Sequence, residues 1–262
     1  MILTGILRKT VFGILLLLIW ELLYLINVDY LGIWKPYCFP PPLAVAEKIW
    51  QLATDGILLI AVMQSMKRMV IGFGISLCLG VVIGLSILKA KDMEKSLVSL
   101  LMGLQTLPSI CWLPFAVLWF GLNDQAIIFV VVIGSTFSMA LTVESAIKNV
   151  SPVYIKAAKM LGAKGLPMYI SFYIPVTLPA IVAGMKQAWS FSWRALMAGE
   201  MLVSAVGLGQ VLIMGRELAD ISQVVASMVV IVAIGLLVNR LVFEKIEYGI
   251  RRKWGTLIND GE

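Results

Sequence analysis

The stretch SPVYIKAAKMLGAKG, residues 151–165, is a basic segment that separates two long apolar blocks of the chain. Ser151 can cap the first free N–H groups of a helix, and Pro152 suits the first helical position. Gly162 can adopt the left-handed conformation that ends a helix. The stretch therefore predicts a helix of about ten residues, which is too short to be stable alone in water and needs a surface to pack on.

The composition on either side of this stretch indicates a membrane protein. Of the 262 residues, 60% are hydrophobic and 14% are charged, whereas soluble domains carry about 25% charged residues. Several apolar runs reach the roughly 20 residues that span a bilayer. We therefore predict an all-α polytopic domain over residues 1–262, with about six transmembrane helices. Residues 1–60 would form an N-terminal span and an outer amphipathic segment, and residues 61–250 a core with a cytoplasmic loop at 147–173.

The apolar runs place the expected spans at about 11–28, 67–88, 97–121, 125–146, 176–203 and 222–243. The first run could also be a signal peptide, but no small-residue cleavage site follows it, which favours a retained span. Residues 44–55 predict a surface helix at the outer face. Its apolar side would comprise Ala44, Val45, Ile49, Trp50 and Leu52.

Two expected spans carry distinctive residues. In the second, small residues recur every four positions, which allows another helix to approach closely; we favour a helix of the same chain over a second subunit. These residues are Gly72, Ser76, Gly80 and Gly84. In the third, Pro108 and Pro114 each free a carbonyl and predict kinks.

The basic residues set the orientation, because cytoplasmic loops carry an excess of Lys and Arg. If the N-terminus is cytoplasmic, the inside segments include Lys89, Lys91, Lys95, Lys148, Lys156, Lys159, Lys164, Lys245, Arg251, Arg252 and Lys253. The outside segments then hold only Lys35, Lys48, Lys67, Arg68 and Arg216. We therefore predict that both termini, and the stretch at 151–165, are cytoplasmic.

The central stretch resembles a signature of the permease subunits of bacterial ABC importers, which reads E-A-A, three residues, G, nine residues, I, one residue, L-P. Lys156-Ala157-Ala158 is followed by Gly162 at the same spacing, then by Phe172 and Ile174-Pro175. Lys156 replaces the family's Glu, Phe172 its Ile and Ile174 its Leu. Among these permeases the chain is similar to the nitrate/sulfonate/taurine type.

The resemblance implies a type I ABC importer permease fold in the cell inner membrane. It implies a homodimer that binds two cytoplasmic P-loop ATPase subunits, which hold ATP and Mg, and an extracytoplasmic solute-binding protein. The chain itself would be a transport subunit without catalytic residues, metal or cofactor. The residues that contact the ATPase would be Lys156, Ala157, Ala158, Lys159, Leu161 and Gly162, with Lys164 at the rim. The alternative is a positive loop that only fixes the topology.

The fifth span contains charges that are costly in a bilayer, ~2.5–3.5 kcal/mol each at its centre. Arg194 and Glu200 lie six residues apart, which places them ~240° apart around a helix and makes them poor partners. Arg194 either attracts an anion in a pathway or forms a structural ion pair with another span. The expected pathway residues are Trp112, Ser135, Thr136, Ser138, Trp189, Ser190, Trp193, Arg194 and Glu200.

Several other classes of function lack support in the sequence. The chain has no histidine, and Cys38, Cys78 and Cys111 are far apart, so no metal site or disulfide framework is indicated. No G-x-x-x-x-G-K-[ST] loop occurs. The basic residues lie at the ends of apolar runs and do not indicate nucleic acid. A gradient-driven secondary transporter or channel remains the alternative to an importer of a small anion such as nitrate, a sulfonate, taurine or bicarbonate.

Overall fold

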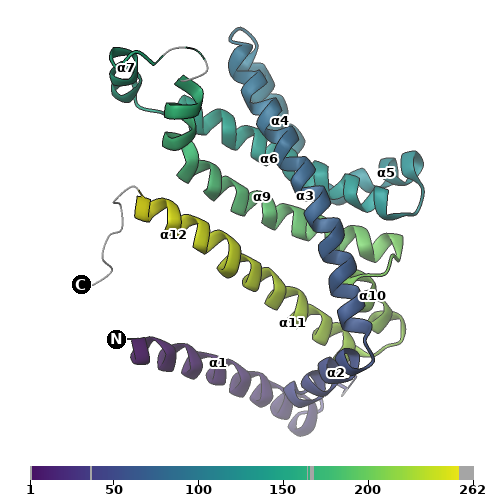
Figure 1. Cartoon of the computed structure of the whole chain (residues 1–262). Helices are drawn as coiled ribbons and strands as arrows, with labels where there is room; N and C mark the ends of the chain where they lie inside the picture. Colours follow the sequence, from purple (N-terminus) through teal and green to yellow (C-terminus); the bar gives the residue numbers. More distant parts are fainter. Residues whose placement is uncertain (1, 36, 164, 166–167, 254–262) are drawn as a thin grey trace. The chain divides into compact units, whose positions relative to one another are not determined.

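The computed structural model describes residues 2–35, 37–163, 165 and 168–253, and every regular element in these ranges is helical (Figure 1). This confirms the predicted all-α fold. Contacts divide the chain into two compact units. Unit 1 comprises Met1–Ser65 and Ser204–Val232, and unit 2 comprises Met66–Val203 and Ala233–Glu262. The helices α3, Ile57–Lys89, and α11, Ile221–Val238, each contribute to both units.

Unit 1 contains α1, Ile2–Tyr24, its π-helical continuation η1, Leu25–Tyr30, the helix α2, Pro42–Thr54, and α10, Leu208–Glu217. The Trp20 indole N–H donates to the Pro40 carbonyl at 3.0 Å. Lys48 and Asp220 form an ion pair at 2.7 Å. Burial disfavours the ionised form of Asp220, but hydrogen bonds from Lys48 and from backbone N–H groups outweigh burial and lower the pKa of this carboxyl.

The predicted surface helix at 44–55 is present as α2, with Pro42 in its first turn. Val45 and Leu52 are buried, as expected for its apolar side. The placement of Trp50 on that side is wrong, because this side chain is 73% exposed. Five residues after Val45, Trp50 lies ~140° around the helix from the buried stripe.

Unit 2 is built around two long helices, α6, Asp124–Lys148, and α9, Ile174–Val203, which lie side by side (Figure 1). α6 also contacts α4, Glu94–Thr106, and α5, Leu113–Phe120. The remaining elements are the short η2, Ser109–Trp112, α7, Pro152–Met160, η3, Tyr169–Tyr173, η4, Asn239–Phe243, and α12, Glu244–Lys253.

Four helical segments of the described chain are long and apolar enough to cross a membrane, and counting each of two bent helix pairs as one span gives up to six. The prediction of about six spans agrees with the upper number. The second span is longer than expected, because α3 begins at Ile57 rather than near 67. The residues between Ile57 and Met66 are themselves mostly apolar and extend the helix.

The third span is broken rather than kinked. α4 ends at Thr106, and the helical segment that starts at Ser109 runs at 93° to it. Leu107 is extended, with φ −69° and ψ 124°, because a residue before proline avoids the helical region. Pro114 produces no kink, since it lies in the first turn of α5, where no N–H is needed.

Glycines allow α6 to be packed closely from two sides. A Cβ added at Gly84 of α3 would lie 2.6 Å from the Ala140 carbonyl oxygen, and one at Gly80 2.6 Å from Met139. On α9, a Cβ at Gly184 would lie 2.1 Å from Thr142. The small residues of the second span therefore pack within the chain, as predicted.

We expect Gly84→Ala to destabilise the protein by about 1–3 kcal/mol, because its methyl group would overlap a backbone oxygen that cannot rotate away. Gly74 lies on the same helix with open space around it, so Gly74→Ala is a matched control that should be neutral or stabilising by up to about 1 kcal/mol. Thermal unfolding of the purified chain in mild detergent measures both. Equal effects of the two substitutions would contradict the packing.

Candidate functional site

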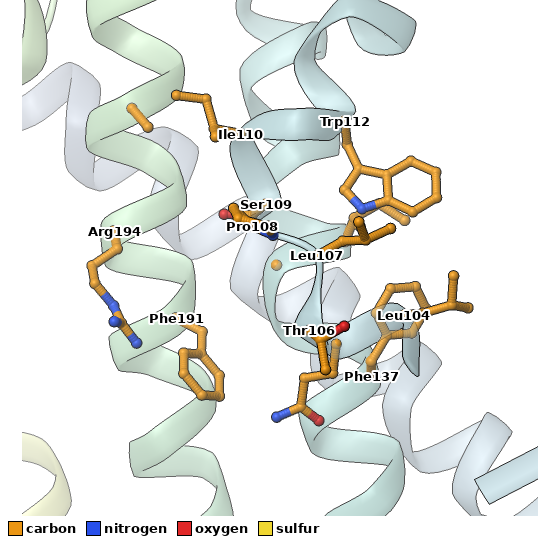
Figure 2. A pocket seen from close by; sticks show the side chains of 14 residues that line it. Leu104, Thr106, Leu107, Pro108, Ser109, Ile110, Trp112, Phe137, Phe191 and Arg194 are labelled. Atoms are coloured by element: carbon orange, nitrogen blue, oxygen red, sulfur yellow. The ribbon is translucent and has the colours of Figure 1, made fainter. Parts of the chain in front are cut away.

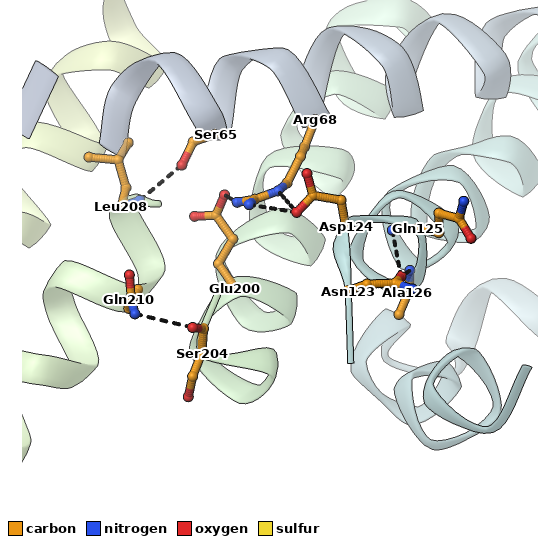
Figure 3. Close-up of polar contacts among 10 residues, drawn as sticks. All are labelled: Ser65, Arg68, Asn123, Asp124, Gln125, Ala126, Glu200, Ser204, Leu208 and Gln210. Atoms are coloured by element: carbon orange, nitrogen blue, oxygen red, sulfur yellow. Dashed lines mark hydrogen bonds and ion pairs between the residues drawn. The ribbon is translucent and has the colours of Figure 1, made fainter. Parts of the chain in front are cut away.

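An ionic cluster joins three helices of unit 2 at one end, with Arg68 and Glu200 buried and the Asp124 side chain 47% exposed (Figure 3). The Arg68 guanidinium on α3 donates from Nε and Nη2 to Asp124 Oδ1 at 3.0 and 2.7 Å, and from Nη1 to Glu200 Oε1 at 2.8 Å. Arg68 is 3% exposed and Glu200 is fully buried. The cluster therefore fixes α3, the first residue of α6 and the end of α9 relative to one another.

The start of α6 is itself set by its capping residue. The Asn123 side-chain oxygen accepts from the N–H groups of Gln125 and Ala126, at 2.9 and 3.2 Å. This cap places Asp124 in the first helical turn, where a carboxylate interacts favourably with the helix dipole. The cap and the ionic cluster thus support each other at the same helix end.

A cavity of about 350 Å³ lies beside the break between α4 and η2 (Figure 2). Arg194 and Phe191 project into it from α9, and Thr106, Pro108 and Ser109 face them from the broken segment. Its apolar wall includes Leu104, Leu107, Ile110, Trp112, Ile133 and Phe137. The cavity combines one cation with an apolar and aromatic wall.

Arg194 is exposed, and its guanidinium lies 5.0 Å from the centre of the Phe191 ring. Its Nε donates to the Ser190 carbonyl at 3.2 Å. Within the described ranges, no carboxylate forms an ion pair with Arg194. Of the two alternatives for this residue, the geometry therefore favours a cation that faces a cavity.

A second cavity of about 450 Å³ adjoins the first, since Gln105 and Thr106 line both. Its wall carries many polar side chains, among them Ser138, Thr142, Glu144, Ser145 and Gln187. Lys148, at the end of α6, forms ion pairs with Glu144 and Glu94. Residues of α4, α6 and α9 line both cavities.

The structure distributes the predicted pathway residues between cavities and helix contacts. Trp112 and Arg194 line the first cavity, and Ser138 lines the second. Ser192 and Ser135 hydrogen-bond at 2.7 Å between α9 and α6. Of the others, Thr136 and Ser190 bond to the carbonyls of Val132 and Lys186 within their own helices, and Ser190 is exposed. Trp189 stacks on Trp193, and Glu200 belongs to the ionic cluster.

The central stretch forms the short helix α7, as predicted, with Pro152 in its first turn. Ser151 is at the N-cap position, but its side chain makes no capping hydrogen bond. At the other end, Gly162 has φ +85°, and the N–H groups of Ala163 and Gly162 bond to the carbonyls of Ala158 and Lys159, both at 3.0 Å. This pattern is a Schellman motif. Lys164 lies outside the described residues.

Large apolar side chains of α7 are exposed. Met160 and Leu161 are 83% and 89% exposed, and Val153 and Tyr154 are also exposed. These four residues lie three or four positions before and after Ala157, so they surround this small residue on one face of the helix. We call them, with Ala157, the α7 apolar face. Ala158, in contrast, is buried.

Comparison with known proteins identifies this arrangement. The profile of a family described as "Binding-protein-dependent transport system inner membrane component" matches residues 76–247. The chain belongs to this family. The matched region of the permease contains α7 and both cavities, but it begins after Arg68.

Three similar proteins show how far the likeness extends. The permease is 28% identical to the nitrate import permease protein NrtB of Leptolyngbya laminosa, with 81% of each chain covered. It is 26% identical to an aliphatic sulfonates transport permease protein, SsuC, of Escherichia coli, with 76% of each covered. An inward facing structure of the MetNI methionine ABC transporter matches the fold with a TM-score of 0.63 and 17% identity, over 76% of this chain and 98% of that one.

The main residue of the site that sequence reasoning missed is Arg68. The sequence analysis counted it among the outside basic residues, at the start of the second expected span, and gave it no role; in the structure it lies in α3 and pairs with Glu200. The expectation that Arg194 and Glu200 do not pair with each other is consistent with this contact. A signal was available, since a buried carboxylate in the fifth span requires a cation elsewhere in the chain.

We expect Arg68→Met to destabilise the permease by about 3–5 kcal/mol, because it takes the guanidinium away from a fully buried carboxylate. Adding Glu200→Met should restore most of the loss, since the buried charge then disappears as well. The exposed neighbour Lys67 provides a control as Lys67→Met. Unfolding midpoints of the three variants test this, and additive losses in the double variant would contradict the pairing.

Proposed function

We propose that this permease forms the translocation pathway of an ATP-driven importer for a small anion such as nitrate, a sulfonate, taurine or bicarbonate. An extracytoplasmic binding protein delivers the anion. Two P-loop ATPase subunits, each a separate chain that holds ATP and Mg, bind the cytoplasmic side of a permease homodimer, with both permease termini cytoplasmic. The observation that carries the proposal is the α7 apolar face.

The α7 apolar face supports a protein partner rather than a loop that only fixes topology. A topological role requires the positive charges of Lys156 and Lys159, but it does not require four large apolar side chains outside the spans. Exposed apolar patches of this kind mark interaction sites. Ala157 at its centre permits close approach of a partner, while Ala158 packs toward the permease itself.

The position of α7 in the chain explains how a partner's movement reaches the cavities. Only residues 149–151 separate α7 from the end of α6, and η3 leads from the following segment directly into α9. α6 and α9 carry walls of both cavities. A displacement of α7 by closing ATPase subunits therefore moves the two helices that enclose the pathway, without chemistry on the permease.

The cavities support an anionic solute. Arg194 provides a cation without a carboxylate partner in the described chain, and relatives are named for nitrate and aliphatic sulfonates, which are anions at neutral pH. Gln105 and Thr106 connect this cavity to the second, whose hydroxyl and amide groups can replace part of the solute's hydration. Family membership disfavours the alternative of a gradient-driven transporter.

We expect Leu161→Asp and Gly162→Arg each to leave membrane insertion intact but to abolish ATP-driven uptake. The first places a charge in the α7 apolar face. The second adds a side chain at a left-handed position, which costs ~1–2 kcal/mol at the helix end. The measurement is co-purification with an equimolar ATPase in mild detergent, together with uptake by cells that carry each variant.

Leu43→Asp is the matched control, because this leucine is also exposed but lies in α2, on the outer side in the proposed topology. It should retain the ATPase. Retention of the ATPase by Leu161→Asp as well would mean that α7 binds something else, such as the membrane surface. This result would contradict the proposal that the α7 apolar face contacts the ATPase.

A further inference from the structure

We propose that the Arg194 cavity binds an organic anion whose single carboxylate or sulfonate is attached to an apolar, preferably aromatic, body, and that it discriminates against inorganic anions of the size of nitrate. This proposal rests on the proposed function and narrows it, because it assigns the solute class of the same pathway and excludes nitrate and bicarbonate from the small anions named there. Relatives are named for nitrate and for aliphatic sulfonates, and the proposal goes beyond these names in preferring an aromatic body and in discriminating against nitrate. It depends on three features of the cavity: its single cation, its size and the chemistry of its wall.

The cation is arranged to receive one anionic group. Arg194 Nε is occupied by the Ser190 carbonyl, so the two terminal nitrogens of the guanidinium remain for a solute. These nitrogens form a planar fork that matches a carboxylate or sulfonate with two parallel hydrogen bonds. The Phe191 ring, 5.0 Å from the guanidinium carbon, supports the cation from one side. The Arg194 guanidinium therefore matches a solute that carries one group of charge −1.

The remaining volume suits an apolar body. About 350 Å³ falls within the roughly 300–1,000 Å³ of pockets that hold organic molecules. Phe191 and Phe137 lie on α9 and α6, and Leu104 and Leu107 lie on the broken segment near them (Figure 2). An aromatic solute whose anionic group is bound by Arg194 would replace water along this wall. Apolar surface of both the solute and the wall would then be buried, which favours binding.

An inorganic oxyanion would gain less from the same cavity. It has no apolar surface to bury, and it must exchange a full hydration shell for protein donors. Besides Arg194, the polar side chains of the described wall are those of Gln105, Thr106 and Ser109, with the indole N–H of Trp112, and the Thr106 hydroxyl already donates to the Gly103 carbonyl at 2.6 Å. Few side-chain donors remain to surround such an ion.

A cysteine placed in the cavity wall provides a site-resolved test on the full-length chain. Ile110→Cys is suited to this test, because Ile110 lines the cavity, whereas the native Cys38, Cys78 and Cys111 are exposed outside the described wall and serve as references. The rate of maleimide modification at position 110 and at each native cysteine is followed by mass spectrometry with benzenesulfonate, methanesulfonate, nitrate or neutral benzyl alcohol present. Benzenesulfonate should protect position 110 at concentrations about tenfold or more below those of methanesulfonate, since its ring adds buried apolar surface.

Variants separate the contributions of charge and ring. Arg194→Gln should reduce protection by benzenesulfonate to the level of benzyl alcohol, and Arg194→Lys, which keeps the charge without the fork, should give an intermediate value. Phe191→Ala should bring benzenesulfonate close to methanesulfonate. Arg216→Gln, an exposed arginine of α10, should change nothing. Monodisperse elution of each variant shows that it is folded.

Two results would overturn the proposal: protection of position 110 in Ile110→Cys by nitrate at concentrations equal to those of benzenesulfonate, or unchanged protection when Arg194→Gln is added. Its failure is distinguishable from failure of the proposed function. Co-purification with an ATPase, without protection by benzenesulfonate, would support the importer function and contradict the proposed solute class. Protection by benzenesulfonate, without a co-purifying ATPase, would support the solute class and contradict the importer function.

Discussion

The Arg68 guanidinium, held between Asp124 and Glu200, is the interaction on which the core of the permease depends. Glycine contacts set how closely α3 and α9 approach α6, but close packing alone permits sliding and rotation of helices. The ionic cluster removes this freedom, because a buried carboxylate without its cation is costly. It fixes the rotation of α9 at one end. Arg194 lies six residues from Glu200, or about 9 Å along the helix at about 1.5 Å per residue, so the direction in which Arg194 points is fixed as well.

The helix α9 has two faces with separate tasks. Ser192, Ala195, Leu196 and Gly199 are buried, and Ser192 and Gly199 contact α6 directly. Phe191, Arg194 and Ala198 lie on the adjacent side and line the first cavity. Of the serines that the sequence suggested for the pathway, Ser135 bonds to Ser192 between helices and Ser190 bonds within α9, while Ser138 lines the second cavity. A polar side chain in a span can therefore either hydrogen-bond within the helix packing or line a cavity, and only the packing of the helices decides which of the two occurs.

Much of the fold could be predicted from residue patterns. Composition specified the class, and the stripe Gly72, Ser76, Gly80 and Gly84 specified a close helix contact, because both depend on local periodicity. Pro152 and Gly162 specified the ends of α7 because their backbone preferences are intrinsic. The break at Pro108 was underestimated, since proline permits either a kink or a break and the choice depends on neighbouring helices.

The candidate site was less predictable. Trp112, Ser138 and Arg194 were predicted for the pathway from their polar or amphipathic chemistry within spans, and the structure places them in cavity walls. The pairing of Arg68 with Glu200 joins positions 132 residues apart, and no periodicity reports on such a contact. The exposed face of Met160 and Leu161 also required the structure, because a short helix of mixed composition does not reveal which side its own chain covers.

The break between α4 and η2 has an electrical consequence. Backbone groups released from a helix inside a bilayer need water or protein partners, and the cavity beside Pro108 supplies room for water. A hydrated space with a cation admits charge, and the membrane potential acts on each elementary charge with ~2.3 kcal/mol per 100 mV. A barrier to ion leak is then expected away from the break, and the end of the core where Arg68 pairs with the fully buried Glu200 is suited to provide it. Insulation of the membrane and assembly of the helix core would then depend on the same ion pair.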